Sequence, residues 1–279
     1  VLCCRSVWMG FLVGGTVTVV LVAGLLWLGC FGRMEAVRSV FEAYLPMRGT
    51  PSPEMEETSP VAEETLAKTI TLSFVGDCML GSPYGSSGWW TLNLFAQEQD
   101  PDYFFRGVYD ILAADDWTIA HCEGVFTDQK LPEAPKSGKP AYWYRGPSSN
   151  AEIFKAGSVE IVSVANNHVM DYGVRGRDDT EAALTQAGIM FGGDQKPLIL
   201  EKYGIRIGLY CCTMYTYDYA TRIAKWLEEV RDETDYRIVY YHGGTERVYE
   251  IDAWRELATQ KLIDAGASLV IGNHPHVVQ

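Results

Sequence analysis

The chain has 279 residues, 47% of them hydrophobic, and a net charge of −13 at pH 7. This length is enough to bury a sizeable core in one large domain or two smaller ones. The acidic charge argues against binding of nucleic-acid backbones, so an anionic substrate would need local arginines, lysines or a metal ion. The seven cysteines contain no CxxC pair, which excludes a zinc ribbon and a thioredoxin motif.

The N-terminal segment from residue 6 to residue 32 carries no charge. It exceeds the roughly 7–15 apolar residues of a secretory signal and is long enough to span a bilayer. We therefore predict a single-pass membrane anchor over 1–34, with lipoprotein attachment as the alternative, and an extracytoplasmic domain at the cell membrane. Residues 35–69, rich in Pro, Ser, Thr and Glu, predict a solvated stalk. The chain begins with Val and stops just after an apolar run, so we expect further sequence at both ends.

From residue 70 onward, apolar runs alternate with segments of helical periodicity. Strands are predicted over 69–76, 117–122, 159–165, 206–213, 236–242 and 267–273. Helices are predicted over 102–116, 149–157, 174–188, 220–233 and 252–266. Ser149 or Asn150 is the expected N-cap of the second helix, and Gly188 ends the third. The alternation predicts an α/β domain with strands buried on both faces.

All five histidines lie at or just beyond the carboxyl ends of predicted strands, where the functional residues of α/β sheets gather. The polar residues at these ends are Asp77, His121, Glu123, Asn166, Asn167, His168, His242, Asn273, His274 and His276. Nitrogen and oxygen ligands without a thiolate pair predict one or two divalent ions of Mn, Zn or Fe.

The stretch "ANNHVMD" at 165–171 suggests a division of labour. We interpret Asn167 as a neutral metal ligand and His168 as a general acid outside the metal shell. Asp171 would orient the imidazole of His168. In the His-Pro-His stretch, an extended backbone held by Pro275 would place the imidazoles of residues 274 and 276 on the same side.

Other polar and aromatic residues leave two readings open. Arg145 precedes a predicted helix and either holds an anion or forms a surface ion pair. Glu246 either orients His242 or is solvated. Cys78 and Cys122 flank the acids, and we expect them to fill the core. Loop aromatics either line a pocket for an extended substrate or cover the core edge: Trp89, Trp90, Tyr142, Trp143 and Tyr144.

Five segments together resemble the capsule-synthesis CapA domain family of poly-γ-glutamate capsule proteins, within the metallophosphatase (calcineurin-like phosphoesterase) superfamily. They are "GDCMLG" (76–81), "HCEGVF" (121–126), "ANNHVMDYG" (165–173), "YYHGGTE" (240–246) and "GASLVIGNHPHVVQ" (266–279). The resemblance covers residues 70–279 and implies a four-layer αββα sandwich with its site on strand-end loops. It also implies that His168 stands at the position of the general acid. The metal ligands that it implies are Asp77, Glu123, Asn167, His242, His274 and His276.

Two positions depart from the pattern of that family. Met79 stands two residues after Asp77, where phosphoesterases usually carry a histidine ligand, an absence that the CapA family shares. The family has Asn-Leu-Glu where this chain has His121-Cys122-Glu123. His121 is therefore either a replacement ligand or a donor behind the shell, and Asn166, Arg145 and Glu246 are further candidates around the shell or substrate.

The resemblance implies a role in synthesis, export or anchoring of a capsular polymer, with poly-γ-glutamate as the polymer. The expected partners are the membrane, the anionic polymer and the subunits of its synthase, and the sequence does not indicate an oligomeric state. The residues favour a metal-dependent hydrolase-type site. The alternatives are a non-catalytic scaffold that binds metal or polymer in a membrane synthase complex, and a phosphoesterase unrelated to capsule.

Overall fold

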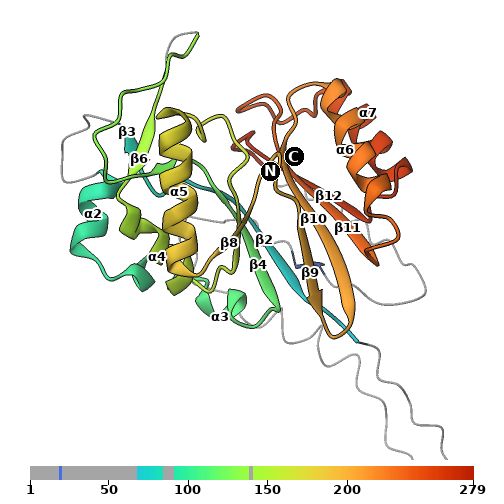
Figure 1. Cartoon of the computed structure of the whole chain (residues 1–279), viewed down its shortest axis with the longest axis horizontal. Coiled ribbons are helices and arrows are strands. Elements are labelled where there is room, and N and C mark those ends of the chain that lie inside the picture. Colours follow the sequence, from blue (N-terminus) through green and yellow to red (C-terminus); the bar gives the residue numbers. More distant parts are fainter. Residues whose placement is uncertain (1–18, 21–67, 84–90, 138–140) are drawn as a thin grey trace, which may run out of the picture. The chain divides into compact units, whose positions relative to one another are not determined.

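The structure is a computed structural model that describes residues 19–20, 68–83, 91–137 and 141–279. Two sheets form its centre (Figure 1). The first sheet is parallel, in the order β1-β2-β4-β7-β8. Its strands are β1 (Val19–Val20), β2 (Leu72–Cys78), β4 (Trp117–Cys122), β7 (Ile161–Ser163) and β8 (Met190–Gly192).

The second sheet has the order β12-β11-β10-β9 and is parallel except for β9. Its strands are β9 (Leu198–Lys202), β10 (Ile205–Thr213), β11 (Tyr236–His242) and β12 (Leu269–Asn273). A small third sheet contains β3 (Ser82–Pro83), β5 (Val125–Phe126) and β6 (Tyr144–Gly146). The predicted α/β class is confirmed by this sandwich.

Three hydrophobic clusters account for the packing of the sandwich. The cluster between the two sheets joins Phe74 and Ile119 of the first sheet to Leu209 and Tyr240 of the second. Two outer clusters pack the other face of each sheet against helices. These helices are α4 (Ala151–Ala156) and α5 (Gly173–Ala187) on the first sheet, and α6 (Tyr217–Glu229) and α7 (Ala253–Asp264) on the second (Figure 1).

Alternation along the strands decides which core each side chain enters. Cys122 enters the cluster under α4 and α5, whereas its neighbour Glu123 follows on the opposite face. Cys211 lies between the sheets and Cys212 lies under α6 and α7. Cys78 packs against the cluster of the first sheet, as expected of core filler. All four cysteines that the structure describes are free.

One predicted helix is wrong in extent. Residues 102–116 contain only a 3₁₀ turn, η2 (Pro101–Tyr103), and a short helix, α3 (Tyr109–Leu112). Gly107 lies between them, and glycine in a helix interior is unfavourable by roughly 1 kcal/mol relative to alanine. Asn150 occupies the N-cap position of α4, as expected, after a 3₁₀ turn, η3 (Ser148–Asn150). Its side chain makes no capping hydrogen bond and donates to Leu80 O instead.

Gly188 ends α5 as predicted, with a φ of 79° that favours glycine. The predictions missed α2 (Leu92–Glu98), the small third sheet, β8 and β9. Within the described residues, no helix is long and apolar enough to cross a membrane. The anchor over 1–34 and the stalk over 35–69 fall almost entirely outside the described residues, as do Trp89 and Trp90, so these interpretations stay predictions.

Candidate metal centre

The carboxyl ends of β2, β4, β11 and β12 bring acidic and imidazole side chains from both sheets together. Asp77 stands in register with His121 in the first sheet, and His242 with Asn273 in the second. Four groups of side chains have ligand atoms within 4.8 Å of one another: Asp77–His121–His242, Glu123–His242–His274, Asp77–Glu123–His276 and Glu246–His274–His276. Residues far apart in the sequence therefore share one site.

Glu123 lies at the bottom of this site and is 2% exposed. Burial raises the pKa of its carboxyl to about 8, and the negative charge of Asp77 adds to the rise. Its Oε1 lies 3.9 Å from Nε2 of His168 and 3.9 Å from Nε2 of His242. A buried carboxyl in this state keeps its proton near neutral pH unless a cation lies beside it.

His242 ends β11, and its imidazole is completely buried. Its Nδ1–H donates to Asn273 Oδ1 at 2.7 Å, so a neutral ring carries its lone pair on Nε2. Nε2 faces two oxygens, Asn167 Oδ1 at 2.9 Å and Glu123 Oε1 at 3.9 Å. An imidazole nitrogen beside an amide oxygen and a carboxyl oxygen suits a divalent cation. The contact is compatible with Asn167 as a neutral ligand.

Asp77 connects the two sheets at this edge. Its Oδ2 accepts the backbone N–H of His274 at 3.0 Å, and its Oδ1 lies 3.3 Å from Nδ1 of His242. Burial alone would raise the pKa of this carboxyl, but contact with His242 and the nearby imidazoles of His121 and His276 lower it overall. Asp77 is therefore ionised at neutral pH, unlike Glu123, and offers a negative charge to a cation.

The His-Pro-His stretch bends, and the prediction of an extended backbone is wrong. The φ angles are 95° at His274 and 56° at His276, a region that residues other than glycine rarely adopt. The bend keeps the two rings together, with centroids 6.0 Å apart. Burial, followed by the neighbouring His242, lowers the pKa of His274 to about 4. This imidazole is therefore neutral and able to bind a metal at neutral pH.

His168 forms a second polar group beside the ligand atoms. Its Nδ1–H donates to Asp171 Oδ2 at 2.8 Å, and the Tyr144 N–H donates to the same oxygen at 2.6 Å. The Lys136 ammonium pairs with Asp171 Oδ1 and lies 3.3 Å from His168 Nδ1. Because these contacts engage Nδ1, Nε2 is directed toward Glu123. Asp171 orients the ring in the way that the sequence interpretation requires.

Two local features hold the loops of the site in position. The Asn166 side chain donates to Cys122 O at 2.8 Å and accepts the His168 N–H at 2.8 Å, which ties the loop after β7 to the end of β4. Gly243 follows His242 in close contact with Met214 O, and a side chain there would collide with that backbone. Asn166 thus lies behind the site as a positioning residue.

The remaining predicted residues lie at the periphery. Glu246 is half-exposed, and its Oε1 lies 3.8 Å from His274 Nε2. Asn273, not Glu246, contacts His242 Nδ1, which favours the solvated alternative for Glu246. Arg145 donates to Gln129 O and lies over the Tyr172 ring, contacts that suit a structural role. A role of Arg145 in holding substrate stays a prediction.

Of the loop aromatics, Tyr144 contacts the candidate general acid, His168. Its ring meets the His168 ring edge-on, with centroids 4.7 Å apart. Trp143 donates to Ala134 O, and Tyr142 stacks on Tyr144 with 51% of its surface exposed. These rings lie beside His168, and a role in lining a pocket for an extended substrate stays a prediction.

Sequence reasoning gave no role to three residues of the site. Lys136 comes from a Pro-containing loop with no local pattern that indicates its ion pair with Asp171. Asn273 was recognised as a polar strand end without a role, although it fixes His242. Tyr215 packs edge-on against His274 with ring centroids 5.7 Å apart. Only the strand-end position of Asn273 was a signal that could have found one of them.

Buried atoms without partners indicate whether these residues suit a metal ion. Among the described residues, Glu123 Oε2, His274 Nδ1 and both ring nitrogens of His121 are buried and lack a hydrogen-bond partner. Each such group costs about 1–3 kcal/mol if it stays unsatisfied. Carboxylate oxygens and neutral imidazoles in this proportion suit a Mn, Zn or Fe ion. The residues therefore fit a divalent cation.

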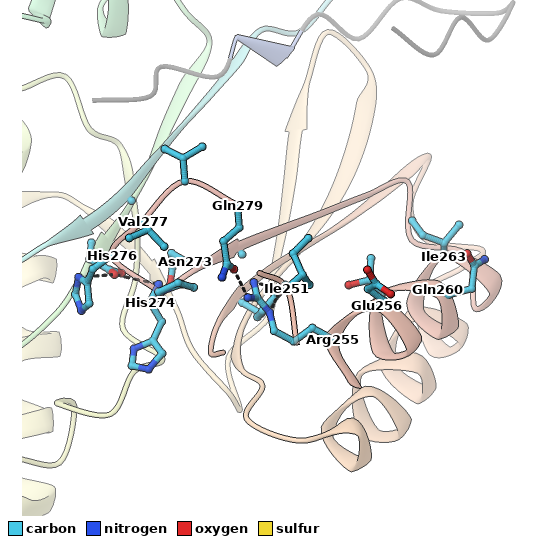
Figure 2. A pocket seen from close by; sticks show the side chains of 17 residues that line it. Ile251, Arg255, Glu256, Gln260, Ile263, Asn273, His274, His276, Val277 and Gln279 are labelled. Atoms are coloured by element: carbon cyan, nitrogen blue, oxygen red, sulfur yellow. Dashed lines mark hydrogen bonds and ion pairs between the residues drawn. The ribbon is translucent and has the colours of Figure 1, made fainter. Parts of the chain in front are cut away.

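A pocket of about 700 Å³ opens beside these ligand atoms (Figure 2). His274 and His276 lie on one side of it, and Glu256 and Gln260 of α7 lie on the other. Asp77 and Arg255 also line the pocket. The pocket gives the ligand atoms an approach from solvent and a polar opposite wall.

Comparison with known proteins gives consistent matches. The family model described as "Bacterial capsule synthesis protein PGA_cap" matches residues 71–279. "Capsule biosynthesis protein CapA" of Bacillus anthracis is 25% identical over 252 residues, covering 80% of this chain and 58% of that protein. "PGA biosynthesis protein CapA" of Bacillus subtilis (strain 168) is 25% identical over 236 residues, covering 75% and 58%. This chain thus spans 58% of the length of both relatives.

A solved structure, that of a hypothetical protein from Thermus thermophilus, is also similar. It has 17% sequence identity, a TM-score of 0.42 and coverage of 64% of each chain.

Proposed function

Since this chain belongs to the family of bacterial capsule synthesis proteins (PGA_cap), we propose that it acts in the synthesis, export or anchoring of a capsular polymer. The names of the two Bacillus relatives support this role, and the second supports poly-γ-glutamate (PGA) as the polymer. A polyanion would be repelled by a chain of net charge −13. Contact with the polymer would therefore depend on a local cation such as a bound metal ion.

The site proposed here is a metal-dependent hydrolase-type site in a domain of the metallophosphatase type. The observation that carries it is the convergence of carboxylates and neutral imidazoles, with buried ligand atoms that lack partners among the described residues. A bound divalent ion would act as a Lewis acid and lower the pKa of a water molecule. Glu123 belongs to two of the ligand groups, so the residues suit one divalent ion or two.

The residues beside the ligands have roles in proton transfer and orientation. His168 would protonate the leaving group through Nε2, which faces the ligand cluster. Asp171 would hold the ring through Nδ1 and stabilise its protonated form, and Lys136 would balance the buried charge of Asp171. Tyr144 would shield the imidazole from bulk water.

We also propose that the domain is tethered to the outer face of the cell membrane, on the ground of the uncharged run 6–32. Protease added to intact cells should then release a fragment that begins in the stalk. Complete protection in intact cells, with cleavage only after lysis, would contradict this placement.

The hydrolase proposal is tested with the purified chain, prepared without chelator. Bound metal is measured by mass spectrometry, and hydrolysis is assayed with generic phosphodiesters and γ-glutamyl amides before and after metal removal. We expect bound transition metal and metal-dependent turnover. Metal binding without turnover, together with loss of surface polymer in cells that carry His168→Ala or His274→Ala, would favour the scaffold alternative. Met79, in the place of the usual histidine ligand, is the observation that supports that alternative.

A further inference from the structure

His121 is the most deeply placed imidazole of the site and has no part in the mechanism above. It lies at the end of β4 with 0% exposure, on the same face of the strand as Glu123. Its ring is nearly parallel to that of His242, with an interplanar angle of 9° and centroids 4.5 Å apart. A ligand atom of His121 lies within 4.8 Å of ligand atoms of Asp77 and His242.

The two ring nitrogens of His121 are available to bind an ion. Within the part of the chain that the structure describes, neither of its nitrogens has a hydrogen-bond partner, although both are buried. An imidazole binds metals through the lone pair of a ring nitrogen, so an ion beside the ring would satisfy one of these two nitrogens.

We propose that His121 is a metal ligand beside Asp77 and takes the place of the imidazole that is missing at Met79. The inference rests on the metal site of the proposed function and extends it to a residue whose nitrogens would otherwise stay unsatisfied. Ligand atoms in a tetrahedral shell are roughly 3.4 Å apart. A separation of up to 4.8 Å therefore closes with a small tilt of one ring.

The neighbouring contacts indicate which ring tilts. Both nitrogens of His242 are engaged, Nδ1 by Asn273 at 2.7 Å and Nε2 by Asn167 at 2.9 Å. No described residue restrains His121 by a hydrogen bond to its ring. His121 can therefore turn a nitrogen toward an ion beside Asp77, whereas His242 keeps Nε2 toward Glu123.

The test compares the whole chain with His121→Phe, which keeps a planar ring and removes both nitrogens. Cys122→Ala is the matched control, because it changes the next residue of β4, equally buried but on the opposite face. Bound metal is counted by mass spectrometry, Mn²⁺ and Zn²⁺ affinities are measured by calorimetry, and Co²⁺ absorption reports the ligand set.

We expect His121→Phe either to lose one ion per chain or to bind that ion at least about tenfold more weakly. Loss of a residue that only supports a ligand already weakens metal binding by about 10–100-fold, and loss of a ligand should weaken it at least as much. Its melting temperature without metal should equal or exceed that of the wild type, whereas the rise on metal addition should shrink. Cys122→Ala should keep wild-type stoichiometry. If His121→Phe does not fold, His121→Asn is used, and an altered Co²⁺ spectrum is the expected result.

Unchanged stoichiometry, affinity and Co²⁺ spectrum in the His121 variant would overturn the inference and assign His121 to a buried water behind the shell. In that case the proposed metal site itself would stand. A wild-type chain that binds no Mn²⁺, Zn²⁺ or Co²⁺ would instead remove the metal site of the proposed function, and the role of His121 with it.

Discussion

The floor and the rim of the site use the same residue types in different surroundings. The floor consists of the buried side chains His121, Glu123, His168, Asp171 and His242, which are 0–8% exposed. The rim consists of the exposed residues Asn167, Glu246 and His276, and the side chains of the latter two are 48% and 39% exposed. Unsatisfied atoms and a carboxyl with a strongly raised pKa belong to the floor.

Solvent explains this difference. Water satisfies the polar atoms of the rim whether or not an ion is bound, so the rim is stable in either state. The floor excludes water, and its lone pairs need a proton or a cation. We therefore expect the floor to determine whether metal binds and reacts, and the rim to adjust how tightly it binds.

The largest expected effect distinguishes His168, which would transfer a proton, from the residues that would bind the metal ion. His168→Ala should lower turnover by about 10²–10⁴-fold, the usual contribution of a general acid, while metal content stays near wild type. Turnover and metal stoichiometry measured on the same preparation provide the check. Loss of metal from His168→Ala to the same extent as from His274→Ala would make His168 a ligand.

The next effect compares floor and rim directly. His242→Ala should weaken metal binding by about 100-fold or more, because it removes a buried ligand and leaves Glu123 without a partner. His276→Ala should weaken binding by only about tenfold, since water can replace an exposed imidazole. Calorimetric titration with Mn²⁺ or Zn²⁺ measures both values. Equal losses in the two variants would remove the distinction between floor and rim.

A smaller effect is expected from the residue that orients the acid. Asp171→Asn should lower turnover by about tenfold, because it disturbs the hydrogen bond to His168 without removing the proton donor. It also leaves Lys136 without its buried counter-charge. The pH profile should change together with the rate, whereas simple destabilisation would lower the amount of active protein at every pH equally.

The mildest test uses pH alone. Below pH 8 the Glu123 carboxyl, with its pKa of about 8, holds a proton that a metal must displace. Metal affinity should therefore rise by about tenfold per pH unit toward pH 8 and then level off. His274, with its pKa of about 4, adds no such dependence near neutrality. Glu123→Gln should flatten the profile, and an unchanged slope would assign the proton to another group.

The same shift sets the sign of a stability effect. The folded pKa of Glu123 lies above the usual value of 4.5, so the metal-free folded state binds more protons than the unfolded state between these pH values. The contribution of Glu123 to the free energy of unfolding should therefore fall as pH rises from about 4.5 to about 8. The lowered pKa values of His274 and His121 oppose this fall below their usual value of 6.5, so a net fall is expected between about pH 6.5 and pH 8. Metal addition should oppose this fall, which thermal melts across the pH range would measure.

Much of the fold follows from local pattern. The β-branched runs around 117–122 and 236–242 form strands at those bounds, because buried strands need continuous apolar residues. The helix over 102–116 failed because Gly107 breaks it, and the short strands β3, β5 and β6 carry too few residues to show periodicity. The His-Pro-His bend was missed because its positive φ values are imposed by packing and not by residue type.

The sequence by itself determined which side chains stand at strand ends, since parallel strands bring their carboxyl ends to one edge whatever their order. Those positions contained the acids, amides and imidazoles of the site. Only the tertiary structure decided that Lys136 pairs with Asp171, that Asn273 engages His242, and that burial raises the pKa of Glu123 to about 8. Such properties depend on distances and solvent exclusion across two sheets, which no local spacing of residues encodes.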